Sequence, residues 1–300
     1  SAGMRIAITG ASGLIGTALS QRLQRDGHEA VPVVRRPPGD NEIGWSISEN
    51  RIDDGAFEGI DGVVHLAGAG IGDRRWTDEY KREILDSRTV GTALVANAVA
   101  AATNGPKVLL AGSAIGYYGA SPSDTFDETS PAGTGFLAEV CGAWEAAAAP
   151  AGGGDVRVTY LRTGIVLSAN GGALKKQLPL FKFGLGGKMG SGDQWQSWIH
   201  IDDEVTAIIH LLTSDLAGAV NLTAPPPVTN VEFTKTLGDV LGRPTFLPIP
   251  KFGPKLVLGG ELADNLLFNG QKVVPTALQA DGYEFEFPTL DGALRDLLKK

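Results

Sequence analysis

Three glycines at a fixed spacing are the first residues whose type and position suggest chemistry. The segment Gly10-Ala11-Ser12-Gly13-Leu14-Ile15-Gly16 follows an apolar run, Arg5–Thr9, and opens a stretch with helical periodicity. Unpaired backbone N–H groups and the positive dipole end of a helix attract phosphate, and glycine allows a tight turn and a close backbone approach. The segment therefore predicts a site for a dinucleotide pyrophosphate. Its spacing is G-x-x-G-x-x-G, not the commonest G-x-G-x-x-G, and glycines that serve only a turn are the alternative.

Two arginines, Arg35 and Arg36, indicate which dinucleotide this is. They follow the second apolar run, Ala30–Val34, roughly 20 residues past the loop, where a carboxylate binds the ribose of NAD or an arginine accommodates the 2′-phosphate of NADP. No acidic residue ends that run, and guanidinium groups match phosphate geometry. The sequence favours NADP (NADPH) over NAD, with a solvated pair of loop arginines as the alternative.

Three hydroxyl groups, those of Ser113, Tyr117 and Tyr118, are candidates for proton transfer. They follow the apolar run Lys107–Ala111, and open α/β sheets bind ligands at the carboxyl ends of their strands. Either tyrosine acts as a general acid if a nearby cation or the cofactor lowers a pKa that is otherwise about 10. Aromatic packing beside the nicotinamide is the equal alternative.

Arg162, after the run Val156–Leu161, is the best placed cation for orienting a substrate or the cofactor. Lys81 and Arg88 are also candidates, although a solvated helix face explains them more simply. His200 fits a packed interface better than a catalytic base, and Asp202 is expected to cap a helix. The four histidines are not paired at ligand spacing, so no metal is predicted.

Strands and helices that would position these groups alternate along the first half of the chain. Helices are expected over the stripe Ile15 to Leu23, which stops at Asp26-Gly27, over the stripe around Leu94 to Ala102, and from Phe136 to Ala149. Strand–helix alternation predicts βαβ units and a parallel sheet. The expected strands are Arg5–Thr9, Ala30–Val34, Val63–Ala67, Lys107–Ala111 and Val156–Leu161.

Beyond Arg162 the chain becomes richer in glycine and proline, which indicates a second lobe. The predicted fold class is α/β: a Rossmann-type doubly wound parallel sheet with a smaller C-terminal α+β lobe. We assign 1–163, with a return segment at about 198–222, to the NADP-binding domain, and 164–197 and 223–300 to the substrate lobe. The loop Gly184–Gly192 is either a mobile lid or a packed crossing between lobes.

Composition restricts the partners. With 26 basic and 34 acidic residues the net charge is −8, and no run of Lys and Arg forms the basic stripe that nucleic acid or an anionic membrane requires. The expected partner is a small-molecule substrate, with no nucleic acid and no membrane, while a homodimer is left open. A single cysteine, Cys141, and the lack of a signal peptide or long apolar stretch predict a cytoplasmic protein.

With these residues placed, the chain resembles an atypical extended short-chain dehydrogenase/reductase of the NAD-dependent epimerase/dehydratase superfamily. The segments SRTVGT (87–92), LRTGIVLS (161–168), GSGDQWQSWIH (190–200) and GQKVVP (270–275) resemble an epimerase subfamily with its own C-terminal domain. The resemblance implies a substrate between the lobes. It also implies that the cofactor lies on Gly10, Ser12, Gly13, Leu14, Ile15, Arg35, Leu66, Ala67 and Gly68.

One departure from the superfamily concerns its chemistry. Members usually carry Tyr-x-x-x-Lys on the helix after the fifth strand, in which the Tyr moves a proton and the Lys lowers its pKa. Here that helix reads FLAEVCGAWE from Phe136, without either residue. The leading hypothesis is an NADP-dependent oxidoreductase or epimerase-like enzyme acting on a small polar carbonyl or hydroxyl compound. The alternative is a protein that binds NADP(H) and reports redox state to a partner.

Overall fold

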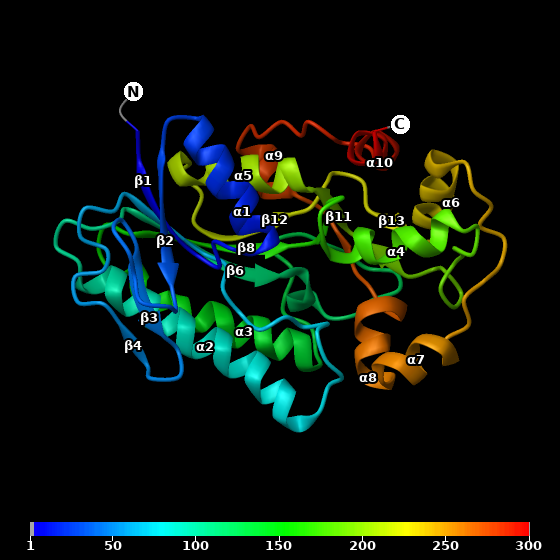
Figure 1. Cartoon of the computed structure of the whole chain (residues 1–300), viewed down its shortest axis with the longest axis horizontal. Helices are drawn as coiled ribbons and strands as arrows, with labels where there is room; N and C mark the ends of the chain where they lie inside the picture. The colour runs from blue at the N-terminus through cyan, green and yellow to red at the C-terminus, as the bar shows by residue number, and fades with distance from the viewer. Residues whose placement is uncertain (1–2, 300) are drawn as a thin grey trace.

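An eight-stranded, mostly parallel sheet runs through the computed structural model, which describes residues 3–299 (Figure 1). Residues 1, 2 and 300, which the predicted domains include, lie outside the described part. The strand order is β12-β8-β6-β5-β1-β2-β3-β4, and only the pair β3–β4 is antiparallel in this sheet. The predicted fold class is confirmed. The strands are β1 (Arg5–Thr9), β2 (Glu29–Val34), β3 (Ile43–Ser46), β4 (Arg51–Ile52), β5 (Gly62–His65), β6 (Val108–Ala114), β8 (Arg157–Thr163) and β12 (Gly218–Leu222).

β6 and β8 extend further than their apolar runs predict. Gly112, Ser113 and Ala114 continue β6 because they pair with residues 161–163 of β8. Small and polar residues have weak strand propensity by themselves, and here the partner strand decides their conformation. The extension places Ser113 beside Arg162 in the register, at the carboxyl edge of the sheet.

Two pairs of helices cover the two faces of the sheet (Figure 1). α1 (Leu14–Arg25) packs beside α5 (Ile201–Thr213) on one face, and α2 (Asp78–Ala101) beside α3 (Phe136–Ala148) on the other. α1 ends as predicted, with Asp26 at its C-cap and Gly27 at a φ of +85°. α5 begins differently, because the imidazole of His200 is its N-cap and accepts a hydrogen bond from Asp202 N. The predicted capping role of Asp202 is therefore wrong, and Asp202 lies in the first turn.

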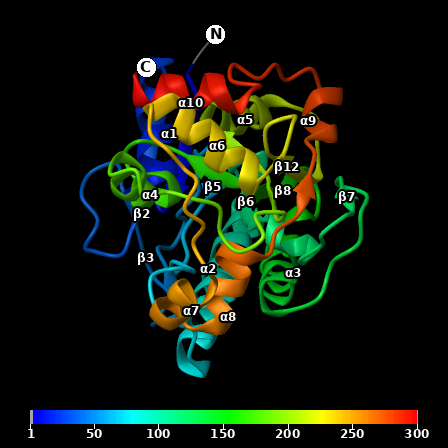
Figure 2. The same ribbon diagram turned by 90° about the vertical axis from the view of Figure 1, so that its right-hand side faces the viewer.

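The C-terminal lobe consists of helices and of strands in three two-stranded sheets, one of which pairs with β7 of the first domain (Figure 2). Its core joins Trp198, Phe181 and Phe233 with leucines of the surrounding helices. β9 (Ile165–Leu167) pairs with β11 (Trp198–His200), β10 (Trp195–Gln196) with β13 (Val228–Thr229), and β7 (Thr125–Phe126) with β14 (Lys272–Val273). The remaining helical elements are η1 (Ile115–Tyr118) and η2 (Ala149–Gly152), which precede β8, and then α4 (Gly172–Lys182), α6 (Asn230–Leu241), α7 (Phe252–Leu258), α8 (Gly260–Ala263), η3 (Asp264–Phe268), α9 (Thr276–Ala280) and α10 (Leu290–Leu298).

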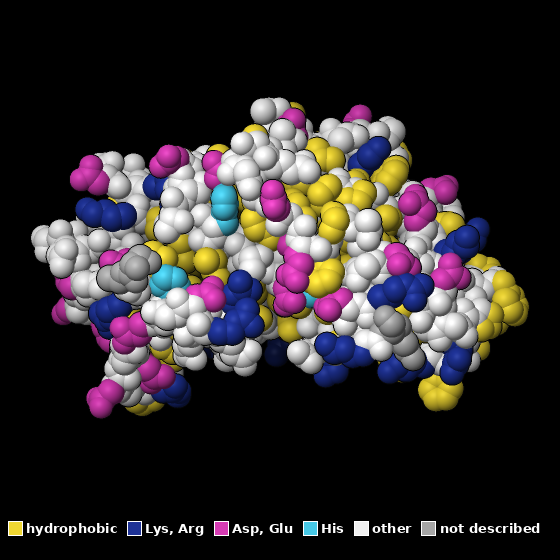
Figure 3. Space-filling model, turned by 90° about the horizontal axis from the view of Figure 1, so that it is seen from above, with side chains coloured by type: hydrophobic (Ala, Val, Ile, Leu, Met, Phe, Trp, Pro, Cys, Tyr) yellow, Lys and Arg dark blue, Asp and Glu magenta, His cyan; other side chains and the backbone are white. Residues whose placement is uncertain are grey.

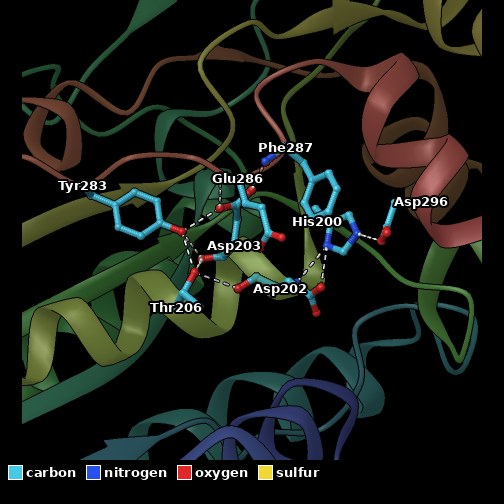
Figure 4. Close-up of polar contacts among 8 residues, drawn as sticks. All are labelled: His200, Asp202, Asp203, Thr206, Tyr283, Glu286, Phe287 and Asp296. Carbon is cyan, nitrogen blue, oxygen red and sulfur yellow. Dashed lines mark hydrogen bonds and ion pairs between the residues drawn. The ribbon is translucent and has the colours of Figure 1, made fainter. Parts of the chain in front are cut away.

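The buried carboxylate of Asp203 fixes the C-terminal segment to α5 (Figure 4). It accepts hydrogen bonds from the Tyr283 hydroxyl at 2.7 Å and from the backbone N–H groups of Glu286 and Phe287, both at 2.9 Å. The ring of His200 stacks on Phe287, and its Nε2 lies 2.8 Å from Asp296. His200 is thus a packed interface residue.

In the described part of the chain, no helix combines the length and the apolar character that crossing a bilayer would require. His200, Asp202 and Asp296 lie close enough together to hold a metal ion, with their ligand atoms within 4.8 Å of one another. Both ring nitrogens of His200 already bond to Asp202 N and to Asp296, so the imidazole has no spare lone pair for an ion.

Candidate functional site

A groove of about 1660 Å³ lies at the carboxyl ends of β1, β2, β3 and β5. Leu14 and Ile15 do not line it, because their side chains pack against the core and only their backbone belongs to the loop. Most residues predicted for the cofactor therefore share one groove. These are Gly10, Ser12, Gly13, Arg35, Arg36, Leu66, Ala67 and Gly68.

The glycine loop can be built only from glycine at two of its positions. Gly10 has a φ of +67°, and a Cβ there would lie 3.1 Å from the backbone of Leu66 and Ala67. A Cβ on Gly16 would lie 2.1 Å from the carbonyl oxygen of Gly10. Gly13 is the N-cap of α1, and no described side chain caps it. The loop thus leaves the first N–H groups of α1 without a side-chain acceptor, as a phosphate site requires.

A buried chain of hydrogen bonds holds the edge of the groove at β5. Thr9 Oγ1 lies 2.7 Å from His65 Nδ1, and His65 Nε2 lies 2.8 Å from Thr92 Oγ1. Thr9 Oγ1 also accepts hydrogen bonds from Leu66 N and Ala67 N. Burial, and then the charge of Arg88, lower the pKa of His65 to about 4, so this imidazole is neutral. Thr9 stands directly before the glycine loop, and this position is the only sign of its role in the sequence.

The two arginines of the groove differ in their partners. Arg36 makes two hydrogen bonds to Glu42, from Nη1 at 2.7 Å and from Nη2 at 2.6 Å. Gly39 N donates to the same carboxylate, and these contacts, Arg36 first, lower the pKa of Glu42 to about 2. Arg35 lines the groove without an ion pair to any residue between 3 and 299. Arg35 is therefore the guanidinium available to a ligand.

Arg88 is buried, and the interpretation of it as a solvated helix residue is wrong. Its Nη1 donates to the Ala69 carbonyl at 2.7 Å, and its guanidinium lies 4.7 Å from the centre of the Trp144 ring. A Cβ on Gly68 would lie 3.0 Å from Arg88 Cζ, so glycine is needed for this close contact. Burial lowers the pKa of Arg88. Arg88 supports the backbone that follows β5 from beneath.

A buried network connects Ser113 and Arg162 through Glu145, which the sequence analysis did not single out. Ser113 Oγ donates to Glu145 Oε2 at 2.6 Å, and Arg162 donates to both carboxylate oxygens from Nε at 3.0 Å and Nη2 at 2.9 Å. Burial alone would lower the pKa of Arg162, but its hydrogen bonds to Glu145 and Tyr118 outweigh burial and raise it. Arg162 thus lies in this network and not among the residues that line the groove.

The two tyrosines occupy unlike positions. Tyr118 is buried, and its hydroxyl donates to Asn221 Oδ1 at 2.6 Å and accepts from Arg162 Nη1 at 3.1 Å. Burial raises its pKa, although Arg162 and Asn221 oppose the shift. Tyr117 is half-buried, and the Arg162 guanidinium lies 3.5 Å from its ring centre. Tyr118 is therefore poorly suited to proton transfer, and Tyr117 remains the candidate phenol, although neither ring lines the groove.

Asn221 extends the network into the C-terminal lobe. Its Nδ2 donates to the Val274 carbonyl at 3.1 Å, and its backbone N donates to Glu128 at 2.8 Å. Ala277 N donates to the same carboxylate, whose pKa burial raises. The only signal for Asn221 in the sequence is a polar residue within an apolar strand.

An ion pair joins the C-terminal lobe to the start of α2. Lys81 forms an ion pair of 2.8 Å with Glu261 of α8, and its Nζ lies 4.7 Å from the centre of the Phe136 ring.

The loop Gly184–Gly192 lies against the segment after α6, through bridges from Gly187 to Phe246 and from Met189 to Ile249. These bridges favour the interpretation of this loop as a packed crossing between lobes, and not as a mobile lid.

Comparisons with known proteins agree with this geometry. The model of the NAD dependent epimerase/dehydratase family matches residues 6–222, and a domain of unknown function (DUF1731) matches residues 249–297. An epimerase family protein of Mycobacterium leprae is 42% identical over 291 residues, covering 96% of this chain and 94% of the relative. The human epimerase family protein SDR39U1 is 39% identical over 302 residues, covering 98% of this chain and 100% of the relative.

Two solved structures are similar along nearly the whole chain. The crystal structure of human SDR39U1 with NADPH has a TM-score of 0.91 at 38% identity and covers 99% of each chain. A nucleoside-diphosphate sugar epimerase from Corynebacterium glutamicum has a TM-score of 0.82 at 33% identity, covering 99% of this chain and 58% of that one.

Proposed function

Because the chain belongs to the NAD dependent epimerase/dehydratase family, we propose that it is an NADP-dependent oxidoreductase or epimerase-like enzyme. Its substrate is a small polar carbonyl or hydroxyl compound held between the Rossmann domain and the C-terminal lobe. The observation that carries the proposal is Arg35, a guanidinium in the groove at the end of β2 with no ion-pair partner in the described part of the chain. The NADPH of the similar human structure supports the same cofactor.

The groove fits a dinucleotide. The backbone of the glycine loop would hold the pyrophosphate, Arg35 the 2′-phosphate, and Leu66 to Gly68 the passage toward the nicotinamide. When bound, the cofactor supplies or accepts a hydride. Thr9 and Arg88 are not among the residues that line the groove, but they fix the backbone on which the cofactor would lie.

The network at the ends of β6 and β8 decides what Ser113 offers a substrate. The Ser113 hydroxyl donates its hydrogen bond to the Glu145 carboxylate, which also accepts two hydrogen bonds from Arg162. Because the Ser113 hydroxyl already donates to Glu145, only its lone pairs remain for a substrate, so Ser113 would accept a hydrogen bond from a substrate hydroxyl. Tyr117 is left as the group that moves a proton.

A second function is favoured by the same network. The hydroxyl of Tyr118 is fully engaged, that of Ser113 is held by Glu145, and the Tyr-x-x-x-Lys pair of the superfamily is absent from the sequence of α3. A site of this kind suits an NADP(H)-binding protein that reports redox state to a partner, without hydride transfer.

We also place the protein in the cytoplasm. Cys141 is a buried free thiol, and burial raises its pKa to about 11, so it resists oxidation. A protein with one inert thiol suits a reducing compartment.

The cofactor assignment is tested by titrating the protein with NADPH and with NADH, followed by the quenching of intrinsic fluorescence. We expect NADPH to bind at least about tenfold more tightly, because a charge-assisted contact to the 2′-phosphate is absent with NADH. Equal affinities would refute NADP dependence.

The two functions are separated by turnover. The NADPH-loaded protein is incubated with pooled polar carbonyl compounds, and absorbance at the nicotinamide band is followed. For an enzyme we expect oxidation that Tyr117→Phe reduces by at least about a hundredfold, since general acid–base catalysis contributes on that order. Tight NADPH binding with no oxidation by any pool would support the sensor instead.

A further inference from the structure

The positive charge of the chain is concentrated in two segments of the C-terminal lobe. Residues 172–192 and 243–258 together hold seven basic residues and no acidic one. Since the whole chain carries −8, the rest of it carries −8 − 7 = −15. The seven residues are Lys175, Lys176, Lys182, Lys188, Arg243, Lys251 and Lys255.

The fold joins these segments into one face, which we call the basic end face. Met189 and Ile249 form a bridge, and Gly190 N donates to the Ile249 carbonyl at 3.0 Å. Arg243 Nε donates to the Lys182 carbonyl at 2.9 Å. Figure 2 looks at this end of the molecule, where the segment after α6 runs past α4 and down to α7. Its border is α6, which carries the exposed acidic residues Glu232 and Asp239.

Large apolar side chains project from the same face. Their exposed fractions run from 72% for Val257 to 81% for Phe183, and α7 has no buried residue. Figure 3 shows hydrophobic side chains gathered at this end of the molecule, with Lys and Arg side chains next to them. Exposed apolar surface of this extent marks an interaction site. Its most exposed members are Phe183, Phe246, Phe252, Leu256 and Val257.

We propose that the basic end face binds the protein peripherally to an anionic lipid surface. Of its seven cations only Lys255 has an ion-pair partner within residues 3–299, Asp264 at 3.2 Å, so the others are free to attract lipid phosphates and carboxylates. Apolar side chains that enter the acyl boundary provide the second contribution, and stable attachment needs both. The remaining charge of −15 is repelled by such a surface and so orients the molecule with this end toward it.

A second copy of the chain fits this face poorly. A two-fold interface would place the same patch on both subunits, and seven positive charges would face seven others. An acidic polypeptide satisfies the charges, but a lipid surface also accommodates side chains that project separately over α4, the segment after α6, and α7. The lipid surface is therefore the occupant that fits both features.

Sedimentation of the full chain with vesicles tests the proposal. The vesicles are made of phosphatidylcholine alone, or of equal parts phosphatidylcholine and phosphatidylserine. We expect the protein to bind only the second kind, and to be released as salt rises from about 50 mM to about 500 mM, because salt screens the attraction. No binding to the anionic vesicles at low salt would overturn the proposal.

Paired variants assign the binding to this face. Lys182→Glu with Lys251→Glu should weaken partitioning by at least about a hundredfold. Arg25→Glu with Lys107→Glu makes the same change of charge elsewhere and should leave partitioning within about threefold. Equal losses in the two variants would show that net charge, and not this face, is responsible, and would refute the proposal.

The double variant Phe246→Ser with Phe252→Ser tests the apolar contribution. Both rings are exposed, so we expect the variant to keep its fold, which a thermal melt would check. We expect the double variant to bind the anionic vesicles at least about tenfold more weakly. We expect the unaltered protein not to bind soluble polyglutamate. If the double variant binds vesicles normally and polyglutamate competes, the face recognises acidic polypeptides and the lipid proposal fails.

Discussion

At the ends of β1, β2 and β5 the chain presents backbone groups and Arg35, which has no ion-pair partner among residues 3–299, to an open groove. At the ends of β6 and β8, by contrast, its polar side chains bond to one another. The groove is shaped by Gly10, Gly16 and the contacts of Thr9, none of which uses a charged side chain. The network is built from Glu145, Arg162 and the groups that they hold. One half of the sheet offers unfilled backbone donors to a ligand, whereas in the other half Glu145, Arg162 and Tyr118 already bond to one another.

This difference shows what the loss of the Tyr-x-x-x-Lys pair means for the structure. A buried cation, Arg162, stands near the candidate catalytic hydroxyls, but it is neutralised by Glu145 from α3. Buried charges require such compensation, because desolvation is costly.

The largest effect is expected from Glu145→Gln. The substitution keeps the shape of the side chain but leaves the Arg162 guanidinium buried without a counter-charge. We expect the free energy of unfolding to fall by about 3–5 kcal/mol, measured by urea denaturation.

An exposed ion pair provides the matched control for that substitution. Arg295 Nε lies 2.9 Å from Asp291 within α10, and both side chains are about half exposed. Asp291→Asn should change the free energy of unfolding by no more than about 0.5 kcal/mol. If Glu145→Gln is as mild as this control, the network does not hold the two strands, and the contrast with the groove is lost.

The sequence predicted the groove far better than the network, for a physical reason. A phosphate loop is local, so Gly10, Gly13 and the helix after them carry their own signal. Glu145 and Arg162 are 17 residues apart, and Tyr118 and Asn221 are 103 apart, so only the folded sheet brings them together. The extension of β6 and the capping of α5 by His200 also depend on tertiary partners.

The basic end face illustrates the same limit for charge. Its basic residues are divided between two segments that lie far apart in the sequence, so they form no long run of Lys and Arg. The net charge of the whole chain predicts no membrane partner, because it averages the positive charge of this face with the negative charge of the other residues. Charge segregation becomes visible only when bridges such as Met189 to Ile249 align the segments.

The next largest effect concerns the pH dependence of stability near the end of β8. Glu204 is fully buried, and its Oε1 accepts a hydrogen bond from Thr163 at 2.9 Å, while its Oε2 has no partner among the described residues. Burial raises the pKa of Glu204 to about 8, from an ordinary value of 4.5. The folded state keeps this proton where the unfolded state has lost it, so stability should fall as pH rises from about 4.5 to about 8.

Replacing Glu204 with Gln should remove that slope. We expect the variant to gain on the order of 3 kcal/mol relative to the unaltered protein between pH 5 and pH 8, measured by urea denaturation at each pH. Glu284→Gln changes an exposed carboxylate and should leave the slope as it is. A slope that persists in the Glu204→Gln variant would show that the buried acid is not the group that titrates.

The smallest expected effect separates the two arginines of the groove. Arg35→Ala should weaken NADPH binding by about 10–100-fold and leave NADH binding unchanged, because a charged hydrogen bond contributes about 1.5–3 kcal/mol. Arg36→Ala should cost less, since Arg36 already bonds to Glu42 and its removal acts by exposing that carboxylate to the phosphate. Removing both Arg36 and Glu42 should therefore restore most of the affinity. If Arg36→Ala costs more than Arg35→Ala, and the loss of Glu42 restores nothing, then Arg36 binds the phosphate and the Glu42 pair must open when the cofactor binds.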